Sequence, residues 1–278
     1  MECIIDDLTV YYAAYGEGRP VLCLHGNSVD HRLMNGCLEP IFAGEAGYRR
    51  IYPDLPGMGR TPAKPWVRTA DDLLRVITRF IEVVIGQEPF LLVGESYGGY
   101  LSLGLLQSLS AQVEGLLLIC PVIYAQGADR RLPPKRLLVR DEGLEVGIDP
   151  SDMASFLSTA VVATRETYAR FAQEVLCGLK LGDRAHLQRV QREGYSLSCE
   201  EELKAMVYEG PCCILTGRQD HVVGYEDALA LAARWPRASI AVLDCAGHNL
   251  QIEQPALFTA HVKAWLECVA VGSSPANI

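Results

Sequence analysis

Six residues in the first half of the chain, Gly94 to Gly99, read Gly-Glu-Ser-Tyr-Gly-Gly. A short apolar run that predicts a buried strand precedes them, and helix-forming residues follow. A serine at such a sharp strand-to-helix turn is typical of a nucleophile, since small residues on either side let strand and helix approach without collision. The motif therefore predicts Ser96 as a nucleophile. The alternative is a plain turn with a capping serine.

A serine hydroxyl is a weak nucleophile and needs a base beside it. Among six histidines, His248 stands in Cys-Ala-Gly-His-Asn, directly after the last predicted strand. A loop at the carboxyl end of a strand can reach a nucleophile at the end of a neighbouring strand. We therefore predict His248 as the base, against the alternative of a histidine in a surface loop.

The base in turn needs a carboxylate that holds its ring in the correct tautomer. Asp220 follows a predicted strand and the turn residues Gly217-Arg-Gln. Asp227 and Asp244 are its competitors, the first expected in the next helix and the second in or just after a strand. The order Ser96, Asp220, His248 is the chain order of one known class of serine hydrolases.

Cleavage of an acyl group also requires N–H donors for the oxyanion. The residue after the nucleophile supplies one, so we predict the backbone N–H of Tyr97. The loop His25-Gly-Asn-Ser follows an earlier predicted strand, and we predict the Asn27 N–H as the second donor, with Ser28 as the alternative. We interpret His25 itself as a structural residue of this loop.

Apolar runs separated by helical patterns would position these residues. The runs are nearly continuous, as in strands buried on both faces of a parallel sheet. Leu8–Tyr15 is expected to end in a hairpin-like turn at Gly16-Glu-Gly18. The other predicted strands are Pro20–Leu24, Tyr48–Tyr52, Pro89–Val93, Val113–Ile119, Pro211–Leu215 and Ser239–Leu243, and the predicted helices are Asp71–Ile85, Tyr97–Ser108 and Gln254–Val269.

The strand pattern breaks at Pro121, and no buried-strand signal returns before about Ala205. Helical stretches are predicted there at Ser151–Leu176 and Asp183–Arg192. We interpret residues 122–205 as a helical insertion into a core made of residues 1–121 and 206–278. The tail from Gly272 to Ile278 is expected to be loose.

The composition limits the classes of function. Of 278 residues, 49% are hydrophobic and 21% charged, which supports a buried core, and the net charge of −9 disfavours nucleic-acid binding. Ten scattered cysteines without metal-ligand spacing predict neither a metal site nor a cofactor, and indicate a reducing cytoplasm. The acidic residues after Met1 do not resemble the start of a signal peptide, and the longest uncharged stretch is too short to span a membrane. We therefore expect a cytoplasmic protein.

The chain resembles the α/β-hydrolase superfamily over Leu8–Pro121 and Met206–Val269. The resemblance rests on His25-Gly26, on Asp54-Leu-Pro-Gly-Met-Gly59, on the Ser96 turn and on the segments around Asp220 and His248. It implies an α/β fold with a mostly parallel central sheet flanked by helices. It also implies that residues 122–205 form an inserted helical cap. Dehalogenases and epoxide hydrolases of this superfamily use an aspartate nucleophile, so Ser96 argues against both chemistries.

Three functions stay open. The first is hydrolysis of a small carboxylic ester or related acyl substrate. The second is hydrolysis of a carbon–carbon bond in a vinylogous diketone acid, whose acid group could bind basic residues of the insertion; the third is ligand binding without catalysis. We expect a small-molecule partner and neither nucleic acid nor membrane, and the oligomeric state stays open, a homodimer included. The basic residues are Arg130, Arg131, Lys135, Arg136 and Arg140.

Overall fold

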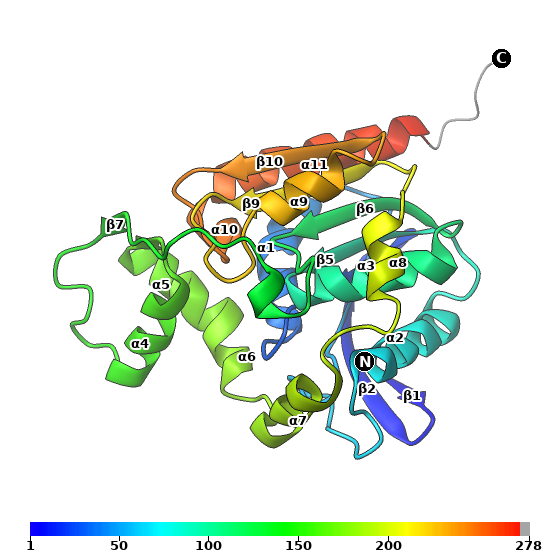
Figure 1. Cartoon of the computed structure of the whole chain (residues 1–278), viewed down its shortest axis with the longest axis horizontal. Helices are drawn as coiled ribbons and strands as arrows, with labels where there is room; N and C mark the ends of the chain where they lie inside the picture. Colours follow the sequence, from blue (N-terminus) through cyan, green and yellow to red (C-terminus); the bar gives the residue numbers. More distant parts are fainter. Residues whose placement is uncertain (273–278) are drawn as a thin grey trace.

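Eight strands form one central sheet in the computed structural model, which describes residues 1–272 (Figure 1). Their order is β1-β2-β4-β3-β5-β6-β9-β10, and every pair from β4 to β10 is parallel. The strands are β1 (Glu2–Ile5), β2 (Leu8–Tyr15), β3 (Arg19–Leu24), β4 (Tyr48–Pro53), β5 (Phe90–Glu95), β6 (Val113–Ile119), β9 (Cys212–Gly217) and β10 (Ala238–Leu243). This arrangement confirms the expected mostly parallel sheet.

The middle of the sheet is buried on both faces. Every residue of β5 and β9 is buried, and β3 is buried from Pro20 onward. Helices cover both faces because the connections between parallel strands cross over the sheet. The carboxyl ends of β3, β5, β6, β9 and β10 therefore lie along one edge of the sheet, where their loops can meet.

The expected hairpin after the first long strand is wrong. The chain turns at Gly16 to Gly18, but β2 pairs antiparallel with β4 and with β1, and β4 lies between β2 and β3. The strand β1 was not expected, because the alternation of buried and exposed residues in Glu2–Ile5 covers only four positions. Turn residues predict that the chain reverses, whereas the choice of pairing partner depends on residues far along the chain.

The helices pack in pairs on the two faces of the sheet (Figure 1). One pair is α1 (His31–Phe42) with α11 (Pro255–Gly272), and the other is α2 (Ala70–Val84) with α3 (Tyr97–Leu109). Further helices follow the last strands, α9 (Glu226–Ala232) after β9 and α10 (Leu250–Glu253) after β10. The predicted helices at 71–85, 97–108 and 254–269 correspond to α2, α3 and α11 within a few residues.

The sequence pattern did not predict α1. Its buried residues include Leu33, Met34, Leu38 and Ile41. Pro40 lies inside the helix, and Gly36 breaks the apolar spacing. Both residues are unfavourable in a helix interior, so packing against the sheet must compensate for weak local preference.

The segment between β6 and β9 is mostly helical, and part of it projects to one side of the sheet (Figure 1). Its elements are η1 (Gly127–Asp129), β7 (Val139–Arg140), α4 (Pro150–Thr159), β8 (Val162–Ala163), α5 (Arg165–Phe171), a π-helical turn (Ala172–Leu176), α6 (Cys177–Leu179), α7 (Arg184–Gly194) and α8 (Glu200–Ala205). The helical stretch predicted over Ser151–Leu176 is mostly helical, but β8 interrupts it between α4 and α5. Val161 and Val162 are β-branched and favour the extended pairing of β8 with β7.

Two further expectations concern the C-terminal tail and the absence of a membrane-spanning segment. The loose tail predicted for residues 272–278 lies outside the described residues, apart from Gly272 at the end of α11. Within residues 1–272, no helix combines the length and the apolar character that crossing a membrane requires.

Candidate active site

Ser96 occupies the turn between β5 and α3. Its backbone has φ 52° and ψ −116°, a conformation that residues other than glycine rarely adopt. Three backbone hydrogen bonds hold it: its N–H donates to the carbonyl of Ile119 at 2.9 Å, and its carbonyl accepts from the N–H groups of Val122 at 3.0 Å and Tyr100 at 3.2 Å. These bonds fix the backbone position from which the hydroxyl of Ser96 projects.

A close approach beneath this turn requires glycine. A Cβ at Gly98 would overlap the backbone carbonyl oxygens of Leu24 and His25. Because Gly98 has none, the first turn of α3 packs directly on the end of β3. The serine is thereby brought beside the loop that follows β3.

Ser96, His248 and Asp220 form a continuous hydrogen-bonded chain. His248 Nε2 lies 2.9 Å from Ser96 Oγ, and His248 Nδ1 lies 2.9 Å from Asp220 Oδ2. The other carboxylate oxygen of Asp220 accepts from the N–H groups of Val222 at 2.8 Å and Val223 at 3.1 Å. The structure therefore brings together the three residues that the sequence analysis selected.

Burial and the neighbouring charges shift the pKa values of Asp220 and His248 in opposite directions. Burial alone would raise the pKa of Asp220, but the imidazole and the three hydrogen bonds hold that pKa below its ordinary value. Burial alone would lower the pKa of His248, but the nearby carboxylates of Asp220 and Glu95 raise it to about 9. The site thus stabilises the imidazolium form of His248.

The two competing aspartates are engaged elsewhere. Asp227, in α9, forms an ion pair with Arg131 at 2.6 Å. Asp244 accepts a hydrogen bond from the side-chain amide of Gln219 at 2.7 Å. Neither carboxylate is positioned to orient the imidazole of His248.

The loops that carry Asp220 and His248 are pressed together at the ends of β9 and β10. A Cβ at Gly217, the last residue of β9, would overlap the carbonyl oxygens of Ala246 and Gly247. The absence of a side chain at Gly217 thus allows the carboxylate to approach the ring.

A buried carboxylate that the sequence analysis missed anchors the histidine loop. Glu253 accepts from the N–H groups of Gly247 at 2.6 Å, Val161 at 2.6 Å and Val162 at 3.1 Å. It therefore joins the loop before His248 to the start of β8. No local pattern singles out this residue, because two of its three partners, Val161 and Val162, lie about 90 positions away.

A cavity of about 300 Å³ opens above Ser96 and His248. One part of its wall is apolar, and Glu95, Arg130 and Tyr195 add polar groups. A second cavity of about 580 Å³ shares Asn27, Ser155 and Leu179 with the first. Apolar residues of the first cavity include Val29, Leu33, Val122, Phe171, Val175 and Leu179.

Of the two predicted oxyanion donors, Asn27 borders this cavity, and Tyr97 directly follows Ser96, which also lines it. Tyr97 is the first residue of α3, where N–H groups have no partner within the helix. Within residues 1–272, the N–H groups of Asn27 and Tyr97 donate no hydrogen bond to another residue. Ser28, the alternative, lines the second cavity and has a φ of 69°.

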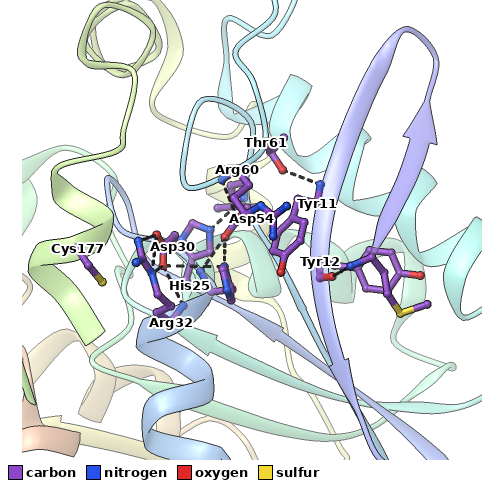
Figure 2. A network of polar contacts seen from close by, with 12 residues as sticks. Tyr11, Tyr12, His25, Asp30, Arg32, Asp54, Arg60, Thr61 and Cys177 are labelled. Carbon is purple, nitrogen blue, oxygen red and sulfur yellow. Dashed lines mark hydrogen bonds and ion pairs between the residues drawn. The ribbon is translucent and has the colours of Figure 1, made fainter. Parts of the chain in front are cut away.

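A polar network holds the loop that carries Asn27 (Figure 2). His25 is buried, and its Nε2 accepts from the N–H of Leu55 at 3.0 Å, as expected for a structural histidine. Asp54 accepts from the N–H and from Nδ1 of His31, both at 2.8 Å, and from the N–H of Arg60 at 2.8 Å. The loops after β3 and β4 are thus tied together.

Two clusters within the described residues have the ligand types of a metal site. One consists of Asp30, His31 and Asp54, and the other combines Cys120 with Asp220 and His248. In both clusters the carboxylates already accept hydrogen bonds from protein N–H groups. The arrangement therefore fits polar networks that organise the loops.

One of the five basic residues of the insertion reaches the cavity. The guanidinium of Arg130 donates to the carbonyls of Tyr124 at 2.8 Å, Ala125 at 2.8 Å and Val222 at 3.0 Å. Within residues 1–272 it forms no ion pair with a carboxylate, whereas Arg131 pairs with Asp227 and Arg140 with Glu145. Arg130 is thus a cation in the cavity wall without a fixed counter-ion.

The fold agrees with a comparison against known families. The model of the alpha/beta hydrolase family matches residues 21–261. The chain belongs to the alpha/beta hydrolase family. An alpha/beta superfamily hydrolase from Oenococcus oeni has a similar structure, with a TM-score of 0.90 and 32% identity over 97% of this chain and 99% of that one.

Two curated relatives of this hydrolase differ in what their names describe. Monoacylglycerol lipase ABHD6 of Rattus norvegicus is 26% identical over 262 residues, covering 86% of this chain and 74% of the relative. The 2-hydroxy-6-oxononadienedioate/2-hydroxy-6-oxononatrienedioate hydrolase of Burkholderia vietnamiensis is 27% identical over 286 residues, covering 94% and 91%. These similarities support hydrolase chemistry, and they leave the bond that is cleaved to be argued from the site.

Proposed function

We propose that this hydrolase cleaves small carboxylic esters or related acyl substrates, with Ser96 as nucleophile, His248 as base and Asp220 as the orienting acid. The observation that carries the proposal is the unbroken chain from Ser96 Oγ through both ring nitrogens of His248 to Asp220, with 2.9 Å at each step. This connectivity is what proton removal from a serine requires.

In the proposed reaction, Nε2 of His248 takes the proton of Ser96 as the oxygen attacks the ester carbonyl. The N–H groups of Asn27 and Tyr97 hold the tetrahedral oxyanion. The imidazolium then gives its proton to the departing alcohol, and the acyl group stays on Ser96. Water, deprotonated by the same ring, attacks the acyl-enzyme and releases the acid.

The size and lining of the cavity support a small and partly apolar substrate. A volume of about 300 Å³ lies at the lower end of the usual range for ligand pockets. We also propose that residues 122–205 act as a cap on the core of residues 1–121 and 206–278, since Arg130, Phe171 and Leu179 contribute to the cavity wall. We also propose that the substrate is a small molecule and that the protein acts in the cytoplasm.

The second candidate is hydrolysis of a carbon–carbon bond in a vinylogous diketone acid. The cation of Arg130 in the cavity wall favours it, because an acid group of the substrate would supply the missing counter-ion. The relative from Burkholderia vietnamiensis, whose name describes hydrolysis of a dienedioate, adds support. A dienoate substrate assayed beside neutral esters separates the two activities.

The decisive test replaces the nucleophile. Ser96→Ala is expected to reduce turnover of a short-chain p-nitrophenyl ester to the uncatalysed level, because within residues 1–272 no other hydroxyl lies at hydrogen-bond distance from Nε2 of His248. Ser108→Ala, which removes a hydroxyl from the other end of α3, is the matched control and is expected to keep full activity. Undiminished turnover by Ser96→Ala would exclude the proposal.

Covalent labelling distinguishes an enzyme from a binding protein of the same fold. A fluorophosphonate is expected to label the wild-type chain at Ser96 and to leave Ser96→Ala unlabelled. Tight retention of a small ligand without labelling or turnover would instead indicate a protein that binds without catalysis.

A further inference from the structure

Glu95 is a charged residue at the end of an otherwise apolar strand. It closes β5 directly before Ser96, its side chain is almost completely buried, and it lines the cavity. Burying a carboxylate costs several kcal/mol unless a partner compensates. Within residues 1–272 it forms no ion pair with lysine or arginine, so the cost points to a role in the site.

The one ion-pair partner of Glu95 in the described part of the chain is the catalytic ring. Glu95 Oε1 lies 3.6 Å from Nε2 of His248, the same nitrogen that faces Ser96 Oγ at 2.9 Å. Nδ1 on the opposite side of the ring faces Asp220. The imidazole therefore lies between two carboxyl groups, one on each nitrogen.

We propose that Glu95 is a positioning residue whose carboxyl shares Nε2 of His248 with Ser96 and so sets the pH at which that nitrogen becomes free to accept the serine proton. This inference rests on the proposed function, since it assigns a role to Glu95 only through His248 as the base. Glu95 itself neither attacks the substrate nor transfers the proton.

The electrostatic argument follows from the charge on each group. A carboxylate 3.6 Å from Nε2 stabilises the imidazolium relative to the neutral ring. Burial raises the pKa of Glu95 to about 7, while His248 opposes that shift and Asp220 adds to it. Glu95 therefore changes charge near neutral pH, and it is negatively charged at the higher pH where the imidazolium loses its proton and the ring becomes available as a base.

The same charge has two effects on rate. It keeps His248 protonated to higher pH, which removes the free base at neutral pH. It also stabilises the imidazolium that forms in the transition state, which speeds the reaction once the ring is neutral. Without the charge of Glu95, the neutral ring of His248 would be available at lower pH, and it would be a weaker base.

Other ionisable groups near Glu95 act on the same equilibrium. Arg130 favours the neutral form of His248, and so works against both carboxylates. Buried thiols and a phenol are also close enough to interact with the Glu95 charge, and burial raises the pKa of each of them, so they stay neutral near pH 7. The ionisable groups that interact with Glu95 are His248, Asp220, Tyr195, Cys37 and Cys120, and Arg130 acts on His248.

The test is the pH profile of kcat/KM for wild type and Glu95→Gln, recorded in a pH-stat with a neutral ester. Glu95→Gln keeps the size of the side chain and removes its charge. We expect the acid limb to move to lower pH by about 1–3 units and the plateau at high pH to fall. The variant should then exceed wild type at the acidic end.

Two further variants and an NMR titration test whether the shift is specific to the charge of Glu95. Glu174→Gln removes another buried carboxyl, which pairs with Arg170, and is expected to leave the midpoint unchanged. Glu95→Asp keeps the charge on a shorter side chain and should give a midpoint between those of wild type and Glu95→Gln. NMR titration of the His248 ring should show the same downward shift without any substrate.

The outcomes are distinguishable. A Glu95→Gln profile that is scaled in rate but unchanged in midpoint, together with an unshifted His248 titration, would overturn the role of Glu95. If Glu95→Gln does not fold, as judged by circular dichroism, Glu95→Asp carries the same test with a smaller shift. Ester turnover that persists in Ser96→Ala would overturn the proposed function itself, while the NMR titration would still report on Glu95 and His248.

Discussion

His248 has a partner on every side that matters for proton transfer. Asp220 faces Nδ1, while Ser96 and Glu95 face Nε2. The carboxylate of Asp220 favours the neutral tautomer that carries its hydrogen on Nδ1. In that tautomer Nε2 is free to accept a proton. In the proposed mechanism, activity at the residue scale depends on Asp220 keeping that hydrogen in place.

Asp220→Asn tests this dependence. The amide can donate toward Nδ1 and so favour the wrong tautomer, and we expect kcat to fall on the order of 10⁴-fold, as in serine proteases. Steady-state kinetics with a p-nitrophenyl ester measures the change. Asp244→Asn alters an exposed aspartate on the neighbouring loop and should keep wild-type kcat. A tenfold or smaller loss in Asp220→Asn would assign the orienting role to another group.

At the scale of elements, the carboxyl ends of the strands bring the site together, and Glu253 connects it to the inserted segment. Its carboxylate holds the loop before His248 and the start of β8 at once. Burial raises the pKa of Glu253, and the three N–H groups that donate to its carboxylate oppose that shift. The position of the insertion and that of the base are thereby coupled.

Glu253→Ala should break this coupling. Three buried N–H groups would lose their acceptor, and we expect the free energy of unfolding to fall by about 2–5 kcal/mol, with a lower kcat. Urea denaturation followed by tryptophan fluorescence gives the first quantity. Glu201→Ala removes an exposed carboxylate from α8 and should change stability little. Equal stability of the two variants would refute the anchoring role.

At the scale of the whole molecule, the site makes stability depend on pH. The pKa of His248 rises from an ordinary 6.5 to about 9 in the folded chain, so folding favours its charged form. That contribution is fully present below about pH 6.5 and is lost as the pH rises through 9. Asp220 acts in the opposite sense, since its lowered pKa adds stability that is lost as the solution becomes strongly acidic.

We therefore expect the free energy of unfolding to decrease by about 2–3 kcal/mol between pH 6.5 and pH 9 on account of His248. Urea titrations at a series of pH values measure this slope. His248→Asn removes the ionisable ring and should show a flatter dependence over the same range. An identical slope in the variant would mean that other groups control stability there.

Local patterns predicted much of the fold. Runs rich in apolar and aromatic residues located seven of the eight strands of the sheet. The runs are most continuous in the central strands, such as β5 and β9, because strands buried on both faces need apolar residues at nearly every position. They did not predict α1, where Pro40 and Gly36 oppose the helix, or the pairing of β2 with β4. Both depend on tertiary packing, which no short window of sequence contains.

For the site, the sequence by itself determined Ser96 and His248 as candidates, because each stands in a turn whose geometry demands particular neighbours. Only the tertiary structure decided among Asp220, Asp227 and Asp244, since the choice depends on which loops meet at the sheet edge. It also decided that Arg130 reaches the cavity and that Glu95 faces Nε2. The physical reason is that these charges act over a few ångströms between segments that packing brings together from distant parts of the chain.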